Sequence, residues 1–111
     1  MSKEIISIPI PPDEETSEYD YKGFMRDFRI ADKFGKKAIE DTYRRAFSEW
    51  KDDVKYFASL VLTLNHQIWY HFNNGDEDTA RVYDRLWKEA DAYGSDHFTG
   101  ADADYYFRFL D

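Results

Sequence analysis

The sequence contains no cysteine, and this absence excludes disulfide bonds, thiolate zinc sites and a cysteine nucleophile. No apolar run is long enough to cross a membrane, and the first residues, MSKEIISIPIPPDEE, lack the basic leader and apolar stretch of a signal peptide. We therefore expect a soluble, cytoplasmic protein with no membrane contact. The sequence also lacks a G-x-S-x-G elbow, a P-loop and a dinucleotide-binding fingerprint, so the common catalytic motifs are absent.

Aromatic residues, in contrast, are abundant: the 111 residues include nine Tyr, nine Phe and three Trp. A chain of this length forms one domain and buries roughly two-thirds of the surface that its unfolded chain exposes. We expect a core built largely from aromatic rings, which needs no metal ion or cofactor to fold.

The net charge of −8 is unevenly distributed along the chain. Residues 1–20 carry one basic and six acidic side chains, residues 21–75 carry ten and seven, and residues 76–111 carry four and ten. The basic middle is one candidate surface for nucleic acid, because contacts to phosphates dominate that affinity. The alternative is that these bases pair with the acidic ends inside the monomer or are simply solvated.

The N-terminal segment, residues 1–23, is acidic and we expect it to be partly flexible. Ile6, Ile8 and Ile10 alternate weakly, and three prolines between residues 9 and 12 restrict any strand here to an edge. We expect short extended or β segments near this end. The stretch FMRDFRI, residues 24–30, fits either a short strand or a helical turn.

A helical pattern begins at Lys36 and continues to residue 73. Apolar residues follow each other at intervals of three or four, which is typical of one helix face: Ile39, Tyr43, Phe47, Trp50, Val54, Phe57, Val61, Leu64, Ile68 and Phe72. The KDD at residues 51–53 offers an N-cap and predicts a break, although one long helix remains an alternative. Residues 73–75, Asn-Asn-Gly, suit a helix end.

A second helix is predicted from Asp76 to Tyr93, with Gly94 as its stop. Its acidic first turn complements the helix dipole, and the short connection before it requires antiparallel packing against the preceding helix. Residues 105–110 fit a short helix or a strand. The predicted fold is therefore mainly α, an antiparallel helical hairpin or small bundle, with residues 24–111 forming a single helical domain.

The two histidines of this hairpin are poorly placed for a metal. His66 and His71 are five residues apart, whereas ligands on one helix are spaced by three or four. We expect a partly buried His66 and a surface His71, with no metal site. The acidic pairs all lie where helix starts recruit carboxylates, so we expect a non-enzymatic protein.

The basic middle shares one feature with a helix-turn-helix, because Ala31 and Gly35 have the offset that this motif uses. Lys36 and Asp41 occupy positions where the motif needs apolar side chains, so the motif fails. Direct nucleic-acid binding stays the less favoured alternative, and its candidate residues are Lys33, Lys36, Lys37, Arg44 and Arg45. The aromatic C-terminal cluster, residues 105–109, is predicted to close the core.

Five stretches, FRIADKFG, DTYRRAFSEWKDD, LNHQIWYHF, VYDRLWKEADAY and YYFRFLD, carry a resemblance over residues 24–111. The chain resembles small acidic proteins of prophages and conjugative elements of Gram-positive gut bacteria, a group with no assigned activity. This resemblance implies context only, and no functional residue is carried over from it.

In that context, short acidic proteins are often inhibitors of host defence nucleases, similar to anti-CRISPR and anti-restriction proteins. We therefore expect a protein partner, such as a CRISPR effector or a restriction nuclease, whose basic groove meets an acidic surface. The candidate residues are Asp76, Glu77, Asp78, Asp84, Glu89, Asp91, Asp96, Asp102 and Asp104. The alternatives are a nucleic-acid-binding accessory protein and a structural component of the element, as a monomer or homodimer.

Overall fold

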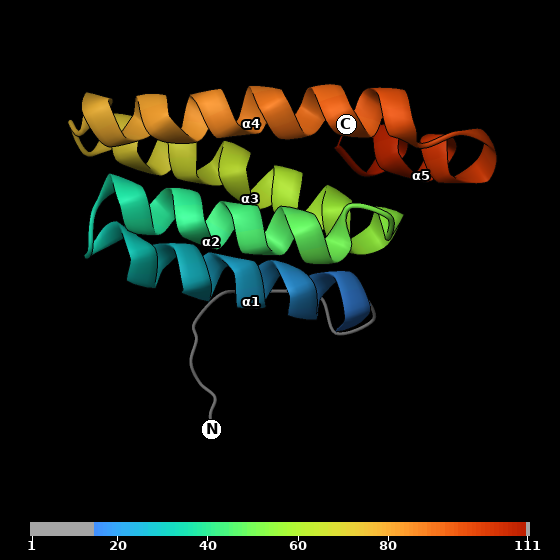
Figure 1. Cartoon of the computed structure of the whole chain (residues 1–111), viewed down its shortest axis with the longest axis horizontal. Helices are drawn as coiled ribbons and strands as arrows, with labels where there is room; N and C mark the ends of the chain where they lie inside the picture. Colours follow the sequence, from blue (N-terminus) through green and yellow to red (C-terminus); the bar gives the residue numbers. More distant parts are fainter. Residues whose placement is uncertain (1–14, 111) are drawn as a thin grey trace.

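The computed structural model describes residues 15–110, with side chains from residue 21 onward. Within this range the chain forms α1 (Glu15–Asp32), α2 (Lys36–Trp50), α3 (Val54–Asn73), α4 (Glu77–His97) and α5 (Gly100–Leu110), and it contains no strand (Figure 1). The predicted helical class is confirmed. The extended segment expected at residues 6–10 lies outside the described residues.

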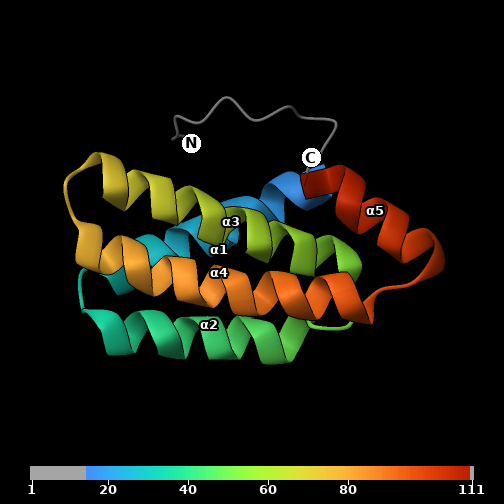
Figure 2. The ribbon, with the colours of Figure 1, turned by 90° about the horizontal axis from the view of Figure 1, so that it is seen from above.

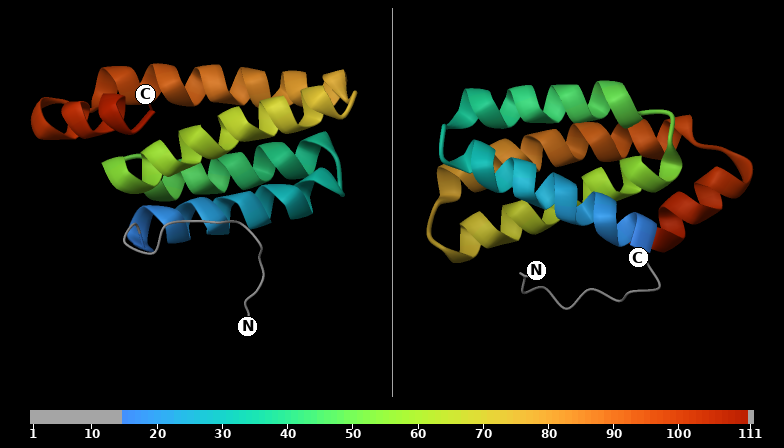
Figure 3. Two further views of the ribbon diagram at one scale, coloured as in Figure 1. Left: turned by 180° about the vertical axis from the view of Figure 1, so that it is seen from behind. Right: turned by 90° about the horizontal axis from the view of Figure 1, so that it is seen from below.

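Helix α3 is the centre of the bundle, because it contacts all the other helices. It packs antiparallel to α4, as the short connection predicted, while α1 and α2 form a second antiparallel pair across it (Figure 2). Helix α5 turns back beside the first half of α3, and the views from behind and below show the same arrangement (Figure 3). No helix among the described residues is long and apolar enough to span a membrane.

The alternatives left open by the sequence are decided in favour of helix. Residues 24–30 belong to α1, where Phe24 and Phe28 are spaced by one turn and both point into the core. Residues 105–110 belong to α5. The predicted break at residues 51–53 is present, and the Asp53 side chain caps α3 by accepting hydrogen bonds from the backbone N–H groups of residues 55 and 56.

Two predicted boundaries differ from the structure. Helix α1 begins at Glu15, so the expected division between residues 23 and 24 falls inside a helix. Helix α4 does not stop at Gly94 but continues to His97. Gly94 is buried against Tyr106 of α5, and a Cβ at this position would lie 2.5 Å from the Cζ atom of that ring. The glycine therefore admits a neighbouring ring and does not end the helix.

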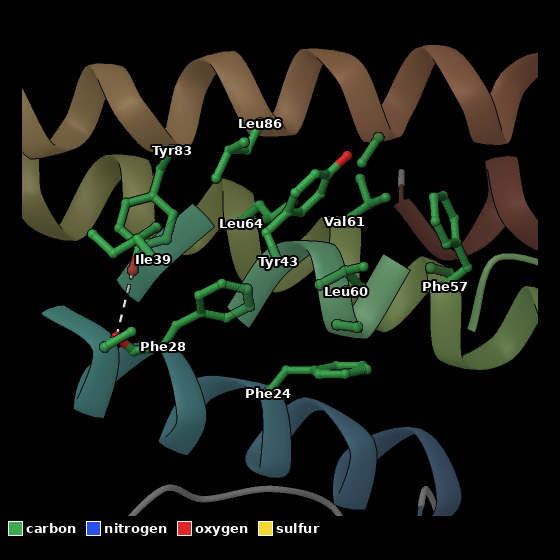
Figure 4. Packing of buried hydrophobic residues seen from close by; sticks show 14 of the residues in the cluster. Phe24, Phe28, Ile39, Tyr43, Phe57, Leu60, Val61, Leu64, Tyr83 and Leu86 are labelled. Carbon is green, nitrogen blue, oxygen red and sulfur yellow. Dashed lines mark hydrogen bonds between the residues drawn. The ribbon is translucent and has the colours of Figure 1, made fainter. Parts of the chain in front are cut away.

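The core is aromatic, as predicted, and lies between all five helices (Figure 4). Phe28, Tyr43, Phe57 and Tyr83 are completely buried. Phe28 and Tyr83 meet edge-to-face with centroids 5.7 Å apart, a favoured arrangement of aromatic rings. Tyr106 closes the core from α5 and is also fully buried. Each such ring contributes about 2–3 kcal/mol of hydrophobic stabilisation.

Candidate functional site

The most concentrated polar cluster surrounds Asp32, at the end of α1. Its Oδ2 atom accepts a hydrogen bond from Gln67 Nε2 at 2.8 Å and lies 2.9 Å from Nε2 of His71. Its Oδ1 atom accepts the hydroxyl proton of Tyr83. The side chains of Asp32 and His71 are only 13% and 9% exposed, so this carboxylate links α1, α3 and α4 inside the bundle.

Two further contacts complete this cluster. Arg29 Nε donates to Gln67 Oε1 at 2.7 Å, and its guanidinium carbon lies 3.8 Å from the centre of the Tyr70 ring. The His71 ring stacks on Tyr83 with centroids 5.5 Å apart. The donors and acceptors of the cluster therefore engage one another, and its clear task is to hold three helices together.

His71 was predicted at the surface but is buried, because its position one turn after Gln67 directs it to Asp32. His66 is the more exposed of the two histidines, with its ring partly covered. His66 meets Tyr21 edge-on with centroids 5.3 Å apart, and partial burial of its ring lowers its pKa. Among the described residues, no group of three or more His, Asp or Glu side chains is arranged to hold a metal ion.

A second polar cluster joins α2 to α4. Glu89 accepts a hydrogen bond from Tyr43 at 3.0 Å and forms an ion pair with Arg44, while Arg85 pairs with Glu40. The hydrogen bond from Arg44 is the main cause of a lowered pKa at Glu89, and burial is the main cause of a raised pKa at Tyr43. Arg44, predicted as a phosphate contact, is therefore engaged within the bundle.

Five of the nine predicted acidic residues make contacts within the protein. Asp76 caps α4 by accepting a hydrogen bond from the backbone N–H of Thr79 at 3.2 Å. The hydrogen bonds that it accepts from the hydroxyl and the backbone N–H of Thr79 lower the pKa of Asp76. The other four engaged acids and their partners are Glu77 with Arg81, Asp84 with Lys88, Glu89 with Arg44, and Asp91 with Tyr106.

The remaining four, Asp78, Asp96, Asp102 and Asp104, form no side-chain hydrogen bond or ion pair with the described residues. Asp78 lies in the first turn of α4 and Asp96 in its last, which places them about 27 Å apart along the helix axis. The structure thus separates Asp78 from Asp96, Asp102 and Asp104, which lie on either side of the turn between α4 and α5, and does not bring all four together on one surface.

The candidate basic residues are similarly divided. Lys37 forms an ion pair with Asp41 at 3.4 Å, and Arg44 forms one with Glu89. Lys33, Lys36 and Arg45 have no ion pair within residues 21–110. Lys33 and Lys36 flank the turn between α1 and α2, where the Phe34 ring is 77% exposed.

One surface feature without a signal in the sequence is a groove between α3, α4 and α5, with a volume of about 250 Å³. Its apolar lining comes from Leu62 on α3, Trp87 on α4, and Phe107 and Leu110 on α5. The polar lining residues are Asn65, Asp91 and Ser95. Within the aromatic C-terminal cluster, residues 105–109, Phe107 is 49% exposed and lines the groove, whereas Tyr106 is buried and closes the core.

The apolar surface continues along α3 beyond the groove. Trp69 and Phe72 follow Leu62 and Asn65 at intervals of four and three residues, so the four side chains lie on one helix face. Trp69 and Phe72 are each 55% exposed, and their rings meet edge-to-face with centroids 6.0 Å apart. Phe72 was predicted to be inside the bundle, and its exposure marks where the buried face of α3 ends.

No known protein family matches the chain, and neither a curated protein nor a solved structure matches it.

Proposed function

We propose that this chain is a non-enzymatic protein-binding domain. The observation that carries the proposal is the groove between α3, α4 and α5 together with the exposed Trp69 and Phe72 rings beside it. Aromatic side chains grouped on a surface are typical of protein interfaces, where they supply most of the binding energy. We define these residues, the groove lining plus Trp69 and Phe72, as the α3 surface.

The polar clusters argue against catalysis. A general acid or base must reach the proton that it transfers, within hydrogen-bond distance of a substrate. The Asp32 carboxylate faces three donors of its own chain, Gln67, His71 and Tyr83, and its side chain is only 13% exposed. This cluster supports a role in stability.

We further propose that the partner is a nucleic-acid enzyme of a defence system, such as a CRISPR effector or a restriction nuclease. In this version the chain is encoded by a mobile element and inhibits that enzyme. The net charge of −8 supports this version, because a basic nucleic-acid groove attracts an acidic protein and accelerates its association. Three of the four unpaired acids, Asp96, Asp102 and Asp104, lie around the turn between α4 and α5, so that end of the bundle carries the acidic side chains that this version requires.

The test is a pull-down with the tagged full chain from nuclease-treated lysate of a CRISPR-bearing Gram-positive host at low salt. We expect one protein or complex to be retained and identified by mass spectrometry. A variant with Asp96, Asp102 and Asp104 changed to Asn should retain less of it if the charge steers binding, whereas Asp78→Asn serves as the single-charge control. Retention of no protein by the wild-type chain would refute the proposed function.

A second candidate function, nucleic-acid binding, has one specific observation in its favour. The Phe34 ring is 77% exposed between Lys33 and Lys36, and an aromatic ring beside bases can stack on a single strand while lysines contact phosphates. Binding of labelled single-stranded DNA tests this function. Phe34→Ala and Lys36→Gln should weaken the binding, whereas Lys37→Gln is the control, because Lys37 already pairs with Asp41. A structural role as a homodimer predicts instead a doubled mass in light scattering and no binding in either assay.

A further inference from the structure

The charge of the groove between α3, α4 and α5 distinguishes its occupant. Asp91 is the one charged residue that lines it, and no Lys or Arg of the described chain does so. Its Oδ1 atom accepts a hydrogen bond from the buried Tyr106 hydroxyl at 2.7 Å, and Oδ2 accepts none from residues 21–110. This carboxylate is therefore fixed in place with one oxygen unused, next to the apolar side chains of Trp87 and Phe107.

This combination favours a cationic side chain. A guanidinium or ammonium group can bond the unused carboxylate oxygen and also lie against aromatic rings, whose faces attract cations. Trp87 of α4 and Phe107 of α5 supply those rings, while Asn65 and Ser95 add neutral polar groups to the lining. An acidic side chain in the same position would meet Asp91 with like charge.

The size and shape of the surface favour a helix. The groove measures about 250 Å³, which is smaller than the pockets that enclose free organic ligands, roughly 300–1,000 Å³. The α3 surface is longer, since Leu62 and Phe72 are ten residues apart and span about 15 Å along the helix. A helix of about three turns covers that length and presents apolar side chains at intervals of three and four residues.

We propose that the α3 surface binds a basic amphipathic helix of a partner protein. One Lys or Arg of that helix bonds Asp91 in the groove, and the apolar side chains of its next turns cover Trp69 and Phe72. The inference rests on the proposed protein-binding function and specifies the chemistry of its partner. It is compatible with a nucleic-acid enzyme, whose surface helices are rich in Lys and Arg, and it assigns the contact to α3, α4 and α5 rather than to the unpaired acids.

The experiment is a peptide selection on the full chain. An immobilised wild-type protein is presented with a displayed library of 18-residue peptides, in which an apolar helical stripe is kept and the positions within and beside it are randomised. We expect enriched peptides to carry Lys or Arg within or beside the stripe and to bind as helices. Enrichment of peptides without a basic residue there, or of no peptide at all, would overturn the inference.

The variants locate the binding site. Asp91→Asn removes the charge but keeps an oxygen for the Tyr106 hydroxyl, and we expect it to weaken the enriched peptides at least tenfold. Asp78→Asn, on the same helix but outside the groove, should change their affinity less than twofold. Trp69→Ala and Leu62→Glu should also weaken binding, with circular dichroism showing that each variant is folded. Equal affinities of the Asp91 and Asp78 variants would refute the assignment of the cation to Asp91.

The pull-down separates failure of this inference from failure of the proposed function. If a lysate partner is retained equally by wild-type chain and by the Asp91→Asn and Trp69→Ala variants, the chain binds protein through another surface, and only the inference is lost. If no partner is retained at all, the proposed function is lost with it.

Discussion

Substitution of Gly94 by alanine should destabilise this protein, although glycine-to-alanine changes inside helices usually stabilise. Gly94 lies within α4, three residues before its end, and faces Tyr106 of α5. A Cβ here would be 2.5 Å from Cζ, 2.6 Å from the hydroxyl oxygen and 2.7 Å from Cε1 of that ring. The Tyr106 ring is fully buried and its hydroxyl is bonded to Asp91, so it has no free direction in which to move.

The magnitude follows from three opposing terms. Alanine in place of glycine in a helix interior gains about 1 kcal/mol in helix propensity. Forcing a methyl group into a packed contact costs about 1–3 kcal/mol. Displacement of the Tyr106 ring also weakens its hydrogen bond to Asp91, which contributes about 1 kcal/mol. The net expectation for Gly94→Ala is a loss of about 1–3 kcal/mol in the free energy of unfolding.

Gly23→Ala is the matched control. Gly23 lies within α1, and the nearest atom to a Cβ there is the Arg26 Nη2 at 3.9 Å, which is an ordinary contact. This variant should gain about 0.5–1 kcal/mol from propensity alone. Thermal unfolding followed by circular dichroism should show a Tm lower by about 4–12 °C for Gly94→Ala and higher by about 2–4 °C for Gly23→Ala. A rise in Tm for both variants would refute the packing of α5 on Gly94.

Three further predictions concern the polar contacts. Asp53→Ala should lower the free energy of unfolding by about 1 kcal/mol, measured by urea denaturation, because α3 loses its N-cap. Asp53→Ser should restore most of the lost stability, because serine is also a good N-cap residue. Asp32→Ala should cost about 3 kcal/mol, because it leaves buried donors unpaired, and a cost below about 1 kcal/mol would contradict the described cluster. The hydrogen bond from Arg44 lowers the pKa of Glu89 in the folded protein. The stability that ionised Glu89 contributes is therefore fully present above its ordinary pKa of 4.5 and is lost as the pH falls through its lower pKa in the folded protein. Glu89→Gln should therefore show a smaller loss of stability than wild type between pH 5 and about pH 3, measured by urea denaturation.

Helices α2, α3 and α4 could be predicted from the sequence because their signals are local. Regular spacing of apolar residues from Ile39 to Leu64, and the capping aspartate at residue 53, depend only on neighbours within a few positions. Antiparallel packing of α3 and α4 follows from the short connection between them. Segments with both helix-like and strand-like composition, residues 24–30 and 105–110, were decided by packing against α3, which sequence does not display.

The predicted helix end at Gly94 is wrong because a long-range contact, and not a local signal, decides this position. A glycine after an apolar-periodic stretch is a good helix stop by local rules. Here the backbone continues in helical geometry, and residue 94 is a glycine because Tyr106, twelve residues further along, occupies the space that a side chain would fill. The same kind of long-range pairing buries His71, since its partner Asp32 belongs to another helix. Neither contact has a signature within a window of a few residues.

The exposure of the α3 surface results from a difference in helix length, which explains why the periodicity of α3 could not reveal it. Helix α3 has 20 residues and is about 30 Å long, whereas α5 has 11 residues and covers about 16 Å. Because α5 turns back beside the first half of α3, its last residue, Leu110, reaches the region of Leu62 and Asn65, and the face beyond them stays uncovered at Trp69 and Phe72. An apolar face that is buried at one end and bare at the other looks continuous in sequence. The part left bare is the part that a partner helix can complete, with Asp91 at the junction to select its charge.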